Sequence, residues 1–295
     1  MNLEQFAPYA ASRVTDFMHG YIDSLDDAAP RLKESMKYAL LLGGKRARPL
    51  LVYATGKLLG QTEEKLDYVA AAVECVHSYS LIHDDMPEMD NDKLRRGHPT
   101  VHVKFGQAGA LLAGDALQAL AFQFLADKNS GLSDSSVAKL TSILAVNAGY
   151  SGMCGGQALD LEAEKKHLGL DELKVLHSKK TGALIRAAVL MGAYACKHVS
   201  EAICSDLDDY AKWVGLAFQV WDDVLDVIGD TAVMGKTAGA DIALEKSTYP
   251  ALLGIDKAKD FAKECAQKAK DALKTIDGDT SVLSSFADFT VSRDH

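Results

Sequence analysis

Apolar residues recur along this chain at intervals of three and four positions, the spacing that places them on one face of an α-helix. Long stretches that alternate apolar and polar residues, as strands do, are absent. The periodicity predicts helices over residues 3–25, 31–42, 47–59, 63–85, 107–126, 133–154, 171–177, 181–196, 201–228 and 256–275. We therefore expect an all-α protein.

Several of these helices have ends that the sequence marks. Gly43 and Gly60 follow periodic segments and are typical of helix C-termini. Ser133 precedes Asp134 in the manner of an N-cap, and Pro87 should end or kink the helix before it. No repeat, low-complexity segment or Pro/Ser-rich linker interrupts the chain. The simplest expectation is a single domain over residues 1–295.

Composition narrows the class of protein. The chain has 295 residues, 48% of them hydrophobic, which is enough for a substantial core, and a net charge of −9 argues against a general nucleic-acid binder. Its five cysteines form no C-x-x-C pair, which favours a reducing compartment over a disulfide framework or zinc site. The N-terminus lacks a signal-peptide pattern, and the most apolar stretch, 183–196, is too short to span a bilayer. We expect a soluble, cytoplasmic protein with no membrane span.

Two acidic clusters carry most of the chemical information. They are Asp84, Asp85 and Asp90 in LIHDDMPEMDND, and Asp222, Asp223 and Asp226 in QVWDDVLDVIGD. Both adjoin strongly apolar sequence, where carboxylates are costly to bury without a positive partner. Two facing sets would form an oxygen cage for Mg²⁺, which is usually shared with substrate phosphates. The clusters therefore favour a phosphorylated substrate.

Each cluster also has a simpler explanation that the sequence leaves open. Asp222, Asp223 and Asp226 are three and four positions apart on a predicted helix, so they crowd one face and repel without a bound cation. A solvated acidic face would have the same spacing. In the first cluster, a break at Pro87 would return Asp90 toward Asp84, but a polar helix end with turn residues fits as well.

Basic residues accompany the clusters. They are Lys45, Arg46 and Arg48 in GGKRARP, Arg95 and Arg96 in KLRRG, Lys179 and Lys180, and Lys236 and Lys246. The GGKRARP segment joins two predicted helices and presents three cations beside a helix N-terminus, a natural anion site. Any one of these residues alone is more commonly a surface charge. Grouped after each acidic cluster, they predict two diphosphate pockets.

Six motifs in order resemble those of the trans-prenyl diphosphate synthases, most closely the bacterial farnesyl type. They are GGKRARP (43–49), LIHDDMPEMDNDKLRRGHPT (81–100), GGQALDL (155–161), KKTGALI (179–185), FQVWDDVLD (218–226) and GKTAGADIALEKSTYP (235–250). The resemblance covers nearly the whole chain. It implies the isoprenoid synthase fold, a bundle of long helices around a deep central cavity, usually as a homodimer.

The resemblance also implies a role for each matched residue. Three Mg²⁺ ions would be held by Asp84, Asp90 and Asp222, supported by Asp85, Asp223 and Asp226. The allylic diphosphate would be gripped by Arg95, Lys180, Lys236 and Lys246. Isopentenyl diphosphate would be held by Lys45, Arg48, His77 and Arg96. Thr181 and Gln219 would face the developing cation, with Gln157 and Asp160 as a supporting shell.

The implied activity is a Mg²⁺-dependent head-to-tail condensation of isopentenyl diphosphate with dimethylallyl and geranyl diphosphate, a prenyltransferase step of isoprenoid biosynthesis. Tyr79 lies five residues before Asp84, about 7.5 Å along a helix axis. Its ring is expected to stop growth at the farnesyl length, with small Ser80 leaving the cavity open, although an ordinary core aromatic would look the same. A synthase making geranyl or geranylgeranyl diphosphate, and a non-catalytic regulatory subunit, remain alternatives.

Overall fold

The computed structural model describes residues 1–163, 166–228 and 247–293. The described chain is almost wholly helical, with one two-stranded sheet, so the all-α expectation is confirmed. It divides into two compact units. The N-terminal unit comprises Glu4–Thr141 and Tyr194–Lys197, and the C-terminal unit comprises Met1–Leu3, Ser142–Ala193 and His198–His295.

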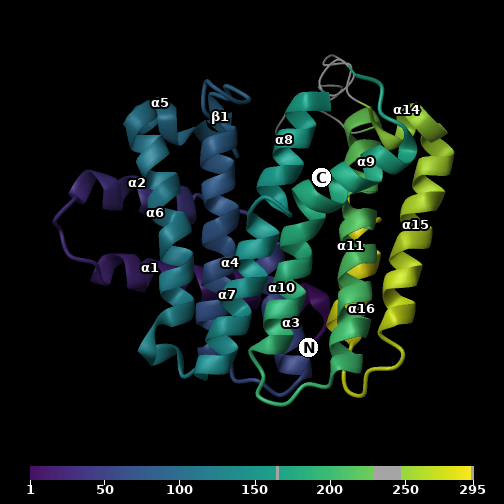
Figure 1. Ribbon diagram of the computed structural model, residues 1–295, viewed down its shortest axis with the longest axis horizontal. Helices are drawn as coiled ribbons and strands as arrows, with labels where there is room; N and C mark the ends of the chain where they lie inside the picture. The colour runs from purple at the N-terminus through teal and green to yellow at the C-terminus, as the bar shows by residue number, and fades with distance from the viewer. Residues whose placement is uncertain (164–165, 229–246, 294–295) are drawn as a thin grey trace. The chain divides into compact units, whose positions relative to one another are not determined.

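The N-terminal unit is a group of helices with one small hairpin (Figure 1). In chain order its elements are α1 (Leu3–Ser24), α2 (Pro30–Leu41), α3 (Ala47–Leu58), α4 (Glu63–Asp84), β1 (Leu94–Arg95), β2 (His98–Pro99), α5 (Val101–Phe105), α6 (Gln107–Ala126) and the 3-10 turn η1 (Lys128–Ser130). α7 (Asp134–Ala148) begins in this unit and continues into the next.

α4 is the central helix of the N-terminal unit. It packs against α3, α6 and α2, and buried residues occur around its whole circumference because 69–76 offers little polar surface. Its contact with α6 is close at Gly114, where an added Cβ would lie 2.0 Å from Nε2 of His83. That nitrogen also lies 3.2 Å from the carbonyl oxygen of Leu111. His83 therefore has a structural role at the helix contact.

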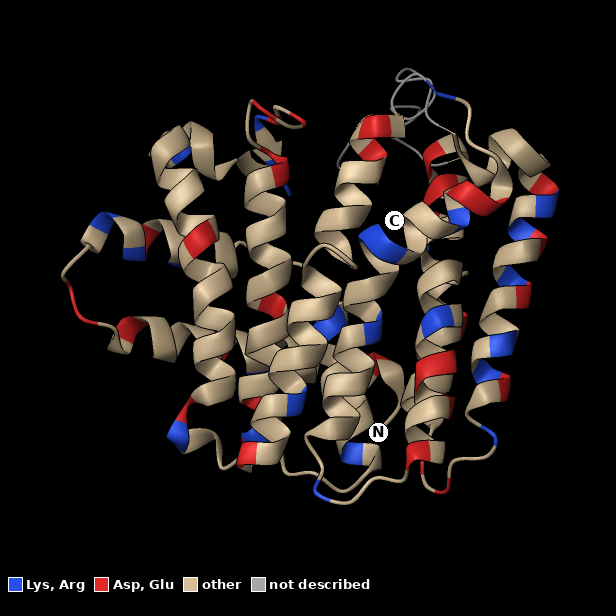
Figure 2. Cartoon of the chain, viewed as in Figure 1, with Lys and Arg blue, Asp and Glu red and all other residues tan. Residues whose placement is uncertain are grey.

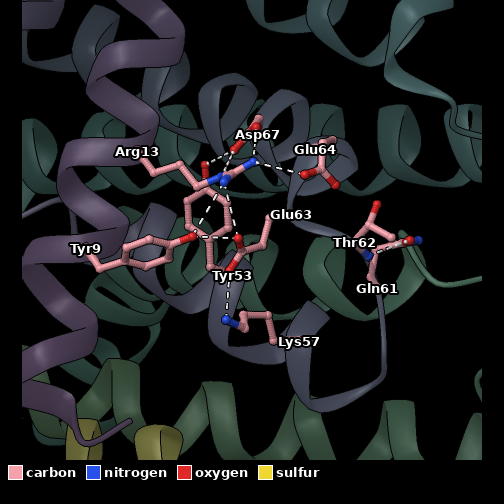
Figure 3. A network of polar contacts seen from close by, with 9 residues as sticks. All are labelled: Tyr9, Arg13, Tyr53, Lys57, Gln61, Thr62, Glu63, Glu64 and Asp67. Carbon is pink, nitrogen blue, oxygen red and sulfur yellow. Dashed lines mark hydrogen bonds and ion pairs between the residues drawn. The ribbon is translucent and has the colours of Figure 1, made fainter.

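A polar network ties α1 to the start of α4 (Figure 3). Arg13 donates from Nε and Nη2 to the two carboxylate oxygens of Asp67, each at 2.7 Å. The hydroxyl of Tyr53 donates to Asp67 at 2.6 Å, and Tyr9 donates to Glu63 at 2.5 Å. The forked Arg–carboxylate contact is the strongest geometry for such a pair. The network fixes the entry of α4 from the end opposite to the acidic cluster.

The C-terminal unit contains the second acidic cluster. Its elements are α8 (Met153–Ala163), α9 (Leu170–His177), the π-helical segment η2 (Ser178–Gly182), α10 (Ala183–Tyr194), α11 (Glu201–Ile228), α14 (Tyr249–Leu253), α15 (Ile255–Ala272) and α16 (Ser281–Thr290). α11 and α15 lie side by side (Figure 1) around a core that includes Val220, Val224 and Tyr249. Lys, Asp and Glu follow the other face of α15 (Figure 2). This is the solvated face of an amphipathic helix.

Most predicted helices are found, with differences at specific places. The helix predicted over 133–154 ends at Ala148, and the GGQALDL segment lies in a separate helix, α8. The prediction was wrong there because the glycines of 149–156 break one helix and begin another. α5, α14 and α16 were missed. α6 is long and apolar enough to cross a membrane, but the core helix of a soluble protein passes the same test, so this is weak evidence.

Candidate active site

The first acidic cluster lies where α4 ends. Asp84 is the last helical residue, Asp85 is the C-cap, and Pro87 follows two residues later. The chain then turns back, and the backbone N–H of Asp90 donates to the carbonyl oxygen of Asp84 at 2.9 Å. Pro87 cannot continue the helix, so the return is encoded locally. The predicted break that brings Asp90 back to Asp84 is confirmed.

Arg95 reaches the same cluster from the hairpin. β1 and β2 pair antiparallel with Arg95 opposite His98, and the connecting Arg96 and Gly97 have positive φ of 53° and 76°. Nε of Arg95 donates to both carboxylate oxygens of Asp85, at 3.1 and 3.3 Å. The Asp85 side chain is 4% exposed. Burial raises its pKa, and Arg95 opposes that shift by favouring the carboxylate.

The GGKRARP segment forms the predicted loop between α2 and α3. Gly43 and Gly44 have φ of 91° and 122°, and Arg96 donates to the Gly43 carbonyl oxygen. An added Cβ on Gly44 would lie 2.5 Å from the Arg96 guanidinium, so glycine is required for this approach. Lys45 is exposed and Arg48 is partly buried. The loop and the hairpin together place Lys45, Arg48 and Arg96 in one neighbourhood.

Arg46 corrects the expectation of three cations facing a ligand. It is 4% exposed and is the N-cap of α3, with φ of 49°. Its Nη1 donates to Oε1 of Glu74 at 2.6 Å, inside the protein. Arg46 is therefore paired inside the protein, and Lys45 and Arg48 remain the candidate anion-binding cations of this segment. The sequence could not show this, because the direction of the side chain depends on Glu74, which lies on α4.

His77, also on α4, lies among these cations. Burial lowers its pKa well below the usual value, and the positive charges of Arg48 and Arg96 act in the same direction. The imidazole is therefore neutral at physiological pH and can exchange hydrogen bonds with an anion without adding charge. The placement of His77 near Arg48 and Arg96 agrees with the predicted diphosphate pocket.

Tyr79 and Ser80 lie one turn before the first cluster. Tyr79 is 5% exposed, and its ring contacts that of His83 with centroids 5.8 Å apart. The Ser80 hydroxyl donates to the carbonyl oxygen of His77 at 2.9 Å. Tyr79 is thus a buried ring on the expected helix, which both the chain-length hypothesis and an ordinary core role would require. Its effect on product length stays a prediction.

The second acidic cluster is largely buried. Asp223 and Asp226 are each 3% exposed. Asp223 accepts hydrogen bonds from Nε2 of Gln219 at 3.2 Å and from the backbone N–H of Tyr249 at 3.1 Å. A solvated acidic face is therefore excluded for these two residues. Their burial on one helix is the arrangement that a cation would stabilise.

Asp222, at the edge of the cluster, is held by a residue that the sequence did not identify. Nη2 of Arg293 donates to Oδ1 of Asp222 at 2.5 Å and to the carbonyl oxygen of Phe218 at 3.1 Å. Trp221 in turn donates from Nε1 to the carbonyl oxygen of Arg293 at 3.0 Å. The partners are 71 residues apart, and no local pattern signals such a contact.

Lys180 and Thr181 are presented by η2, a π-helical segment. π-helical turns are rare in proteins, and those that do occur are often found at functional sites. Nζ of Lys180 lies 2.6 Å from Oδ2 of Asp160, and the Thr181 hydroxyl donates to Oε1 of Gln219 at 2.8 Å. An added Cβ on Gly156 would lie 2.2 Å from the Lys180 backbone nitrogen, so α8 and η2 touch through their backbones. This close packing positions both side chains.

A pocket of about 100 Å³ opens between these elements of the C-terminal unit. Its polar lining comes from Asp160, His177, Lys180, Gln219, Asp223, Ser247 and Thr248, and its apolar lining from Ala163, Leu168, Leu173 and Leu176. The pocket therefore combines a cation, a buried carboxylate and apolar walls. His177 is an addition that the sequence did not single out.

Some predicted site residues are not placed. Lys236 and Lys246 lie within 229–246, outside the described residues. In the ranges that are described, no three His, Cys, Asp or Glu side chains converge as a metal site. The two acidic clusters belong to different units, so their predicted meeting stays a prediction.

Known proteins resemble this chain over most of its length. The model of the polyprenyl synthetase family matches residues 29–281. The farnesyl diphosphate synthase of Escherichia coli (strain K12) is 55% identical over 264 residues, covering 88% of each chain. That of Haemophilus influenzae is 49% identical and covers 96% of this chain and 95% of its own. The solved geranyltransferase from Helicobacter pylori, complexed with magnesium and isoprenyl diphosphate, has a TM-score of 0.82 at 33% identity, covering 97% of this chain and 96% of that chain.

Proposed function

Because the chain belongs to the polyprenyl synthetase family, we propose that it condenses isopentenyl diphosphate head-to-tail with dimethylallyl and then geranyl diphosphate, giving farnesyl diphosphate. The chain is a prenyltransferase with the all-α isoprenoid synthase fold. One observation in particular supports the proposed chemistry. Thr181, Gln219 and the buried Asp223 form one hydrogen-bonded row beside Lys180.

The allylic diphosphate is assigned to the acidic clusters and their cations. In the C-terminal unit these are Asp222, Asp223, Asp226 and Lys180, and in the N-terminal unit Asp84, Asp85, Asp90 and Arg95. Lys236 and Lys246, outside the described residues, complete the assignment. In each cluster one carboxylate forms an ion pair with an arginine. Asp85 pairs with Arg95, and Asp222 pairs with Arg293. Each arginine therefore places a positive charge beside a carboxylate of its cluster.

The donor set fits magnesium. All six candidate ligands are carboxylates, which Mg²⁺ prefers, and two of them are buried on one helix. When bound, the metal supplies Lewis-acid stabilisation of the leaving diphosphate. We propose three ions per active site, held by Asp84, Asp90 and Asp222 with support from Asp85, Asp223 and Asp226.

Isopentenyl diphosphate is assigned to the N-terminal unit. Lys45, Arg48 and Arg96 provide positive charge, and neutral His77 provides a hydrogen bond. Binding this substrate beside the allylic one would make the bimolecular condensation effectively unimolecular, which lowers its activation barrier.

The reaction needs no protein nucleophile. The allylic carbon–oxygen bond breaks, and its electron pair leaves with pyrophosphate. Lys180 and Arg95 would stabilise that anion, while the hydrogen-bonded Thr181 and Gln219 would lie beside the allylic cation. The alkene of isopentenyl diphosphate forms the new carbon–carbon bond, and a proton then passes to the departed pyrophosphate. Apolar walls such as Leu173 and Leu176 exclude water from the cation.

We also propose that the enzyme is a cytoplasmic homodimer. α6 exposes an apolar face that includes Leu111 and Leu112, 48% and 54% exposed. A second copy of the chain would bury such a face. None of the five cysteines, all of which lie in the described residues, forms a disulfide, which a reducing compartment favours.

The function is tested by incubating the purified protein with isopentenyl diphosphate and each allylic starter, with Mg²⁺ and then with a chelator, and sizing the products. Farnesyl diphosphate formed only with metal is expected. Geranyl or geranylgeranyl diphosphate as the end product would correct the assigned chain length, and absence of any product would favour a regulatory subunit.

A further inference from the structure

Arg46 and Glu74 form a buried ion pair directly beneath the loop that carries Lys45 and Arg48. Nη1 of Arg46 lies 2.6 Å from Oε1 of Glu74, and each side chain is 2% exposed. Nη2 of Arg46 also donates to the carbonyl oxygen of Leu40, the penultimate residue of α2. One guanidinium therefore connects the end of α2, the start of α3 and the middle of α4.

The backbone at Arg46 is held in an unfavourable conformation. Its φ of 49° is in the left-handed region, which residues with a Cβ rarely adopt. Such a conformation persists where the surroundings over-determine it. Here the contacts to Glu74 and Leu40 fix the side chain, and so they fix the turn that sets the positions of Lys45 and Arg48.

Glu74 also provides negative charge among several arginines. Burial lowers the pKa of Arg96, and the charge of Glu74 acts in the opposite direction. Among the described residues, Oε2 of Glu74 is buried and has no hydrogen-bond partner, so Arg46 alone holds the carboxylate. Without Glu74, Arg46 would be an uncompensated buried charge beside Arg48 and Arg96.

On the opposite side the loop is held by Arg96, which donates to the carbonyl oxygen of Gly43. The loop is thus held by two arginines. Arg46 anchors it to Glu74 and Leu40 inside the protein, and Arg96, a residue of the proposed diphosphate pocket, binds its Gly43 carbonyl oxygen. A shift of the inner contact would move the backbone that Arg96 binds.

We infer that Glu74, acting through Arg46, is a positioning residue for the diphosphate of isopentenyl diphosphate. The inference rests on the proposed function, because it concerns the pocket assigned to that substrate. It predicts an effect on one substrate, since the pair holds the turn that carries Lys45 and Arg48.

The test is a double-mutant cycle of Glu74→Gln and Arg46→Met, read by calorimetric titration with isopentenyl diphosphate alone, which does not react without an allylic partner. Each single variant is expected to raise the Kd about tenfold, and the double variant is expected to raise it no further. The KM for the allylic substrate should stay within about twofold in all three. The double variant removes both charges together and so protects against misfolding of either single variant.

The matched control is Asp67→Asn. Asp67 lies on α4, as Glu74 does, and the substitution breaks its forked contact with Arg13 of α1 (Figure 3). It should lower the melting temperature while leaving both substrates' constants unchanged. If Glu74→Gln behaves like Asp67→Asn, or if the effects of the two substitutions multiply in the double variant, the inference is overturned. If the wild-type protein itself neither binds isopentenyl diphosphate nor forms product, the proposed function fails instead.

Discussion

The two acidic clusters are built in different ways. The first is organised by nearby sequence: Pro87 ends α4, the chain returns to Asp84, and Arg95 reaches Asp85 from a hairpin ten residues on. The second lies inside the continuous helix α11 and depends on distant residues, with Tyr249 on Asp223 and Arg293 on Asp222. The same set of carboxylates can thus be held by local turn chemistry or by tertiary packing.

The largest expected effect comes from removing one carboxylate from each cluster. Asp84→Asn and Asp222→Asn should each lower kcat on the order of a thousandfold, because both would remove stabilisation of the leaving diphosphate. Steady-state kinetics with geranyl and isopentenyl diphosphates measure the loss. Asp209→Asn, an exposed change on α11, should keep full activity. A large loss in one cluster alone would show that the clusters do not act together.

The dependence of the second cluster on distant packing is tested by Arg293→Met. The substitution leaves Asp222 without its cation and removes the Arg293 hydrogen bond to the Phe218 carbonyl oxygen, which should lower the free energy of unfolding by about 2 kcal/mol. Urea denaturation measures the change. Lys270→Met removes a surface ion pair with Asp288 in the same unit and should cost less than about 1 kcal/mol. Equal effects of the two substitutions would mean that Arg293 adds nothing beyond surface charge.

The first cluster differs again in being preceded by Tyr79. Tyr79→Ala should shift products toward chains longer than farnesyl diphosphate, since a buried ring is removed about 7.5 Å along α4 from Asp84. Chromatography of the dephosphorylated products gives the profile. Ser80→Ala, which keeps a small side chain, should leave it unchanged. A wild-type profile for Tyr79→Ala would reduce Tyr79 to an ordinary core residue.

The smallest effect concerns the pH dependence of stability in the N-terminal unit. Burial and Arg48 lower the pKa of His77, so below about pH 6.5 the unfolded chain binds a proton that the folded chain does not. His77 should therefore reduce stability as pH falls, by at most about 1.4 kcal/mol per pH unit. Melting curves between about pH 5.5 and 7.5 should show a weaker dependence in His77→Gln than in the wild type. An identical dependence of the melting temperature on pH in both proteins would contradict the lowered pKa of His77.

The same contrast between local and distant contacts explains which features of the fold and the candidate site could be predicted from the sequence. Pro87, Gly43 and Ser133 act on their immediate neighbours, so the sequence predicted those helix ends correctly. The inward turn of Arg46 toward Glu74 and the contact of Arg293 with Asp222 could not be predicted, because both depend on packing between helices. The separate α8 and the π-helical η2 were missed because glycine contacts, not periodicity, determine them.

The π-turn in η2 has a consequence for deletions and insertions in this region. A π-turn contains one more residue than the α-helical turn that it replaces. Removing Ser178 would allow a regular α-helical turn here, and Lys180 and Thr181, which lie within the π-turn, would take different positions on it. Lys180 and Thr181 would then lose their alignment with Asp160 and Gln219, so the length of this segment constrains the chain as firmly as the identity of its side chains.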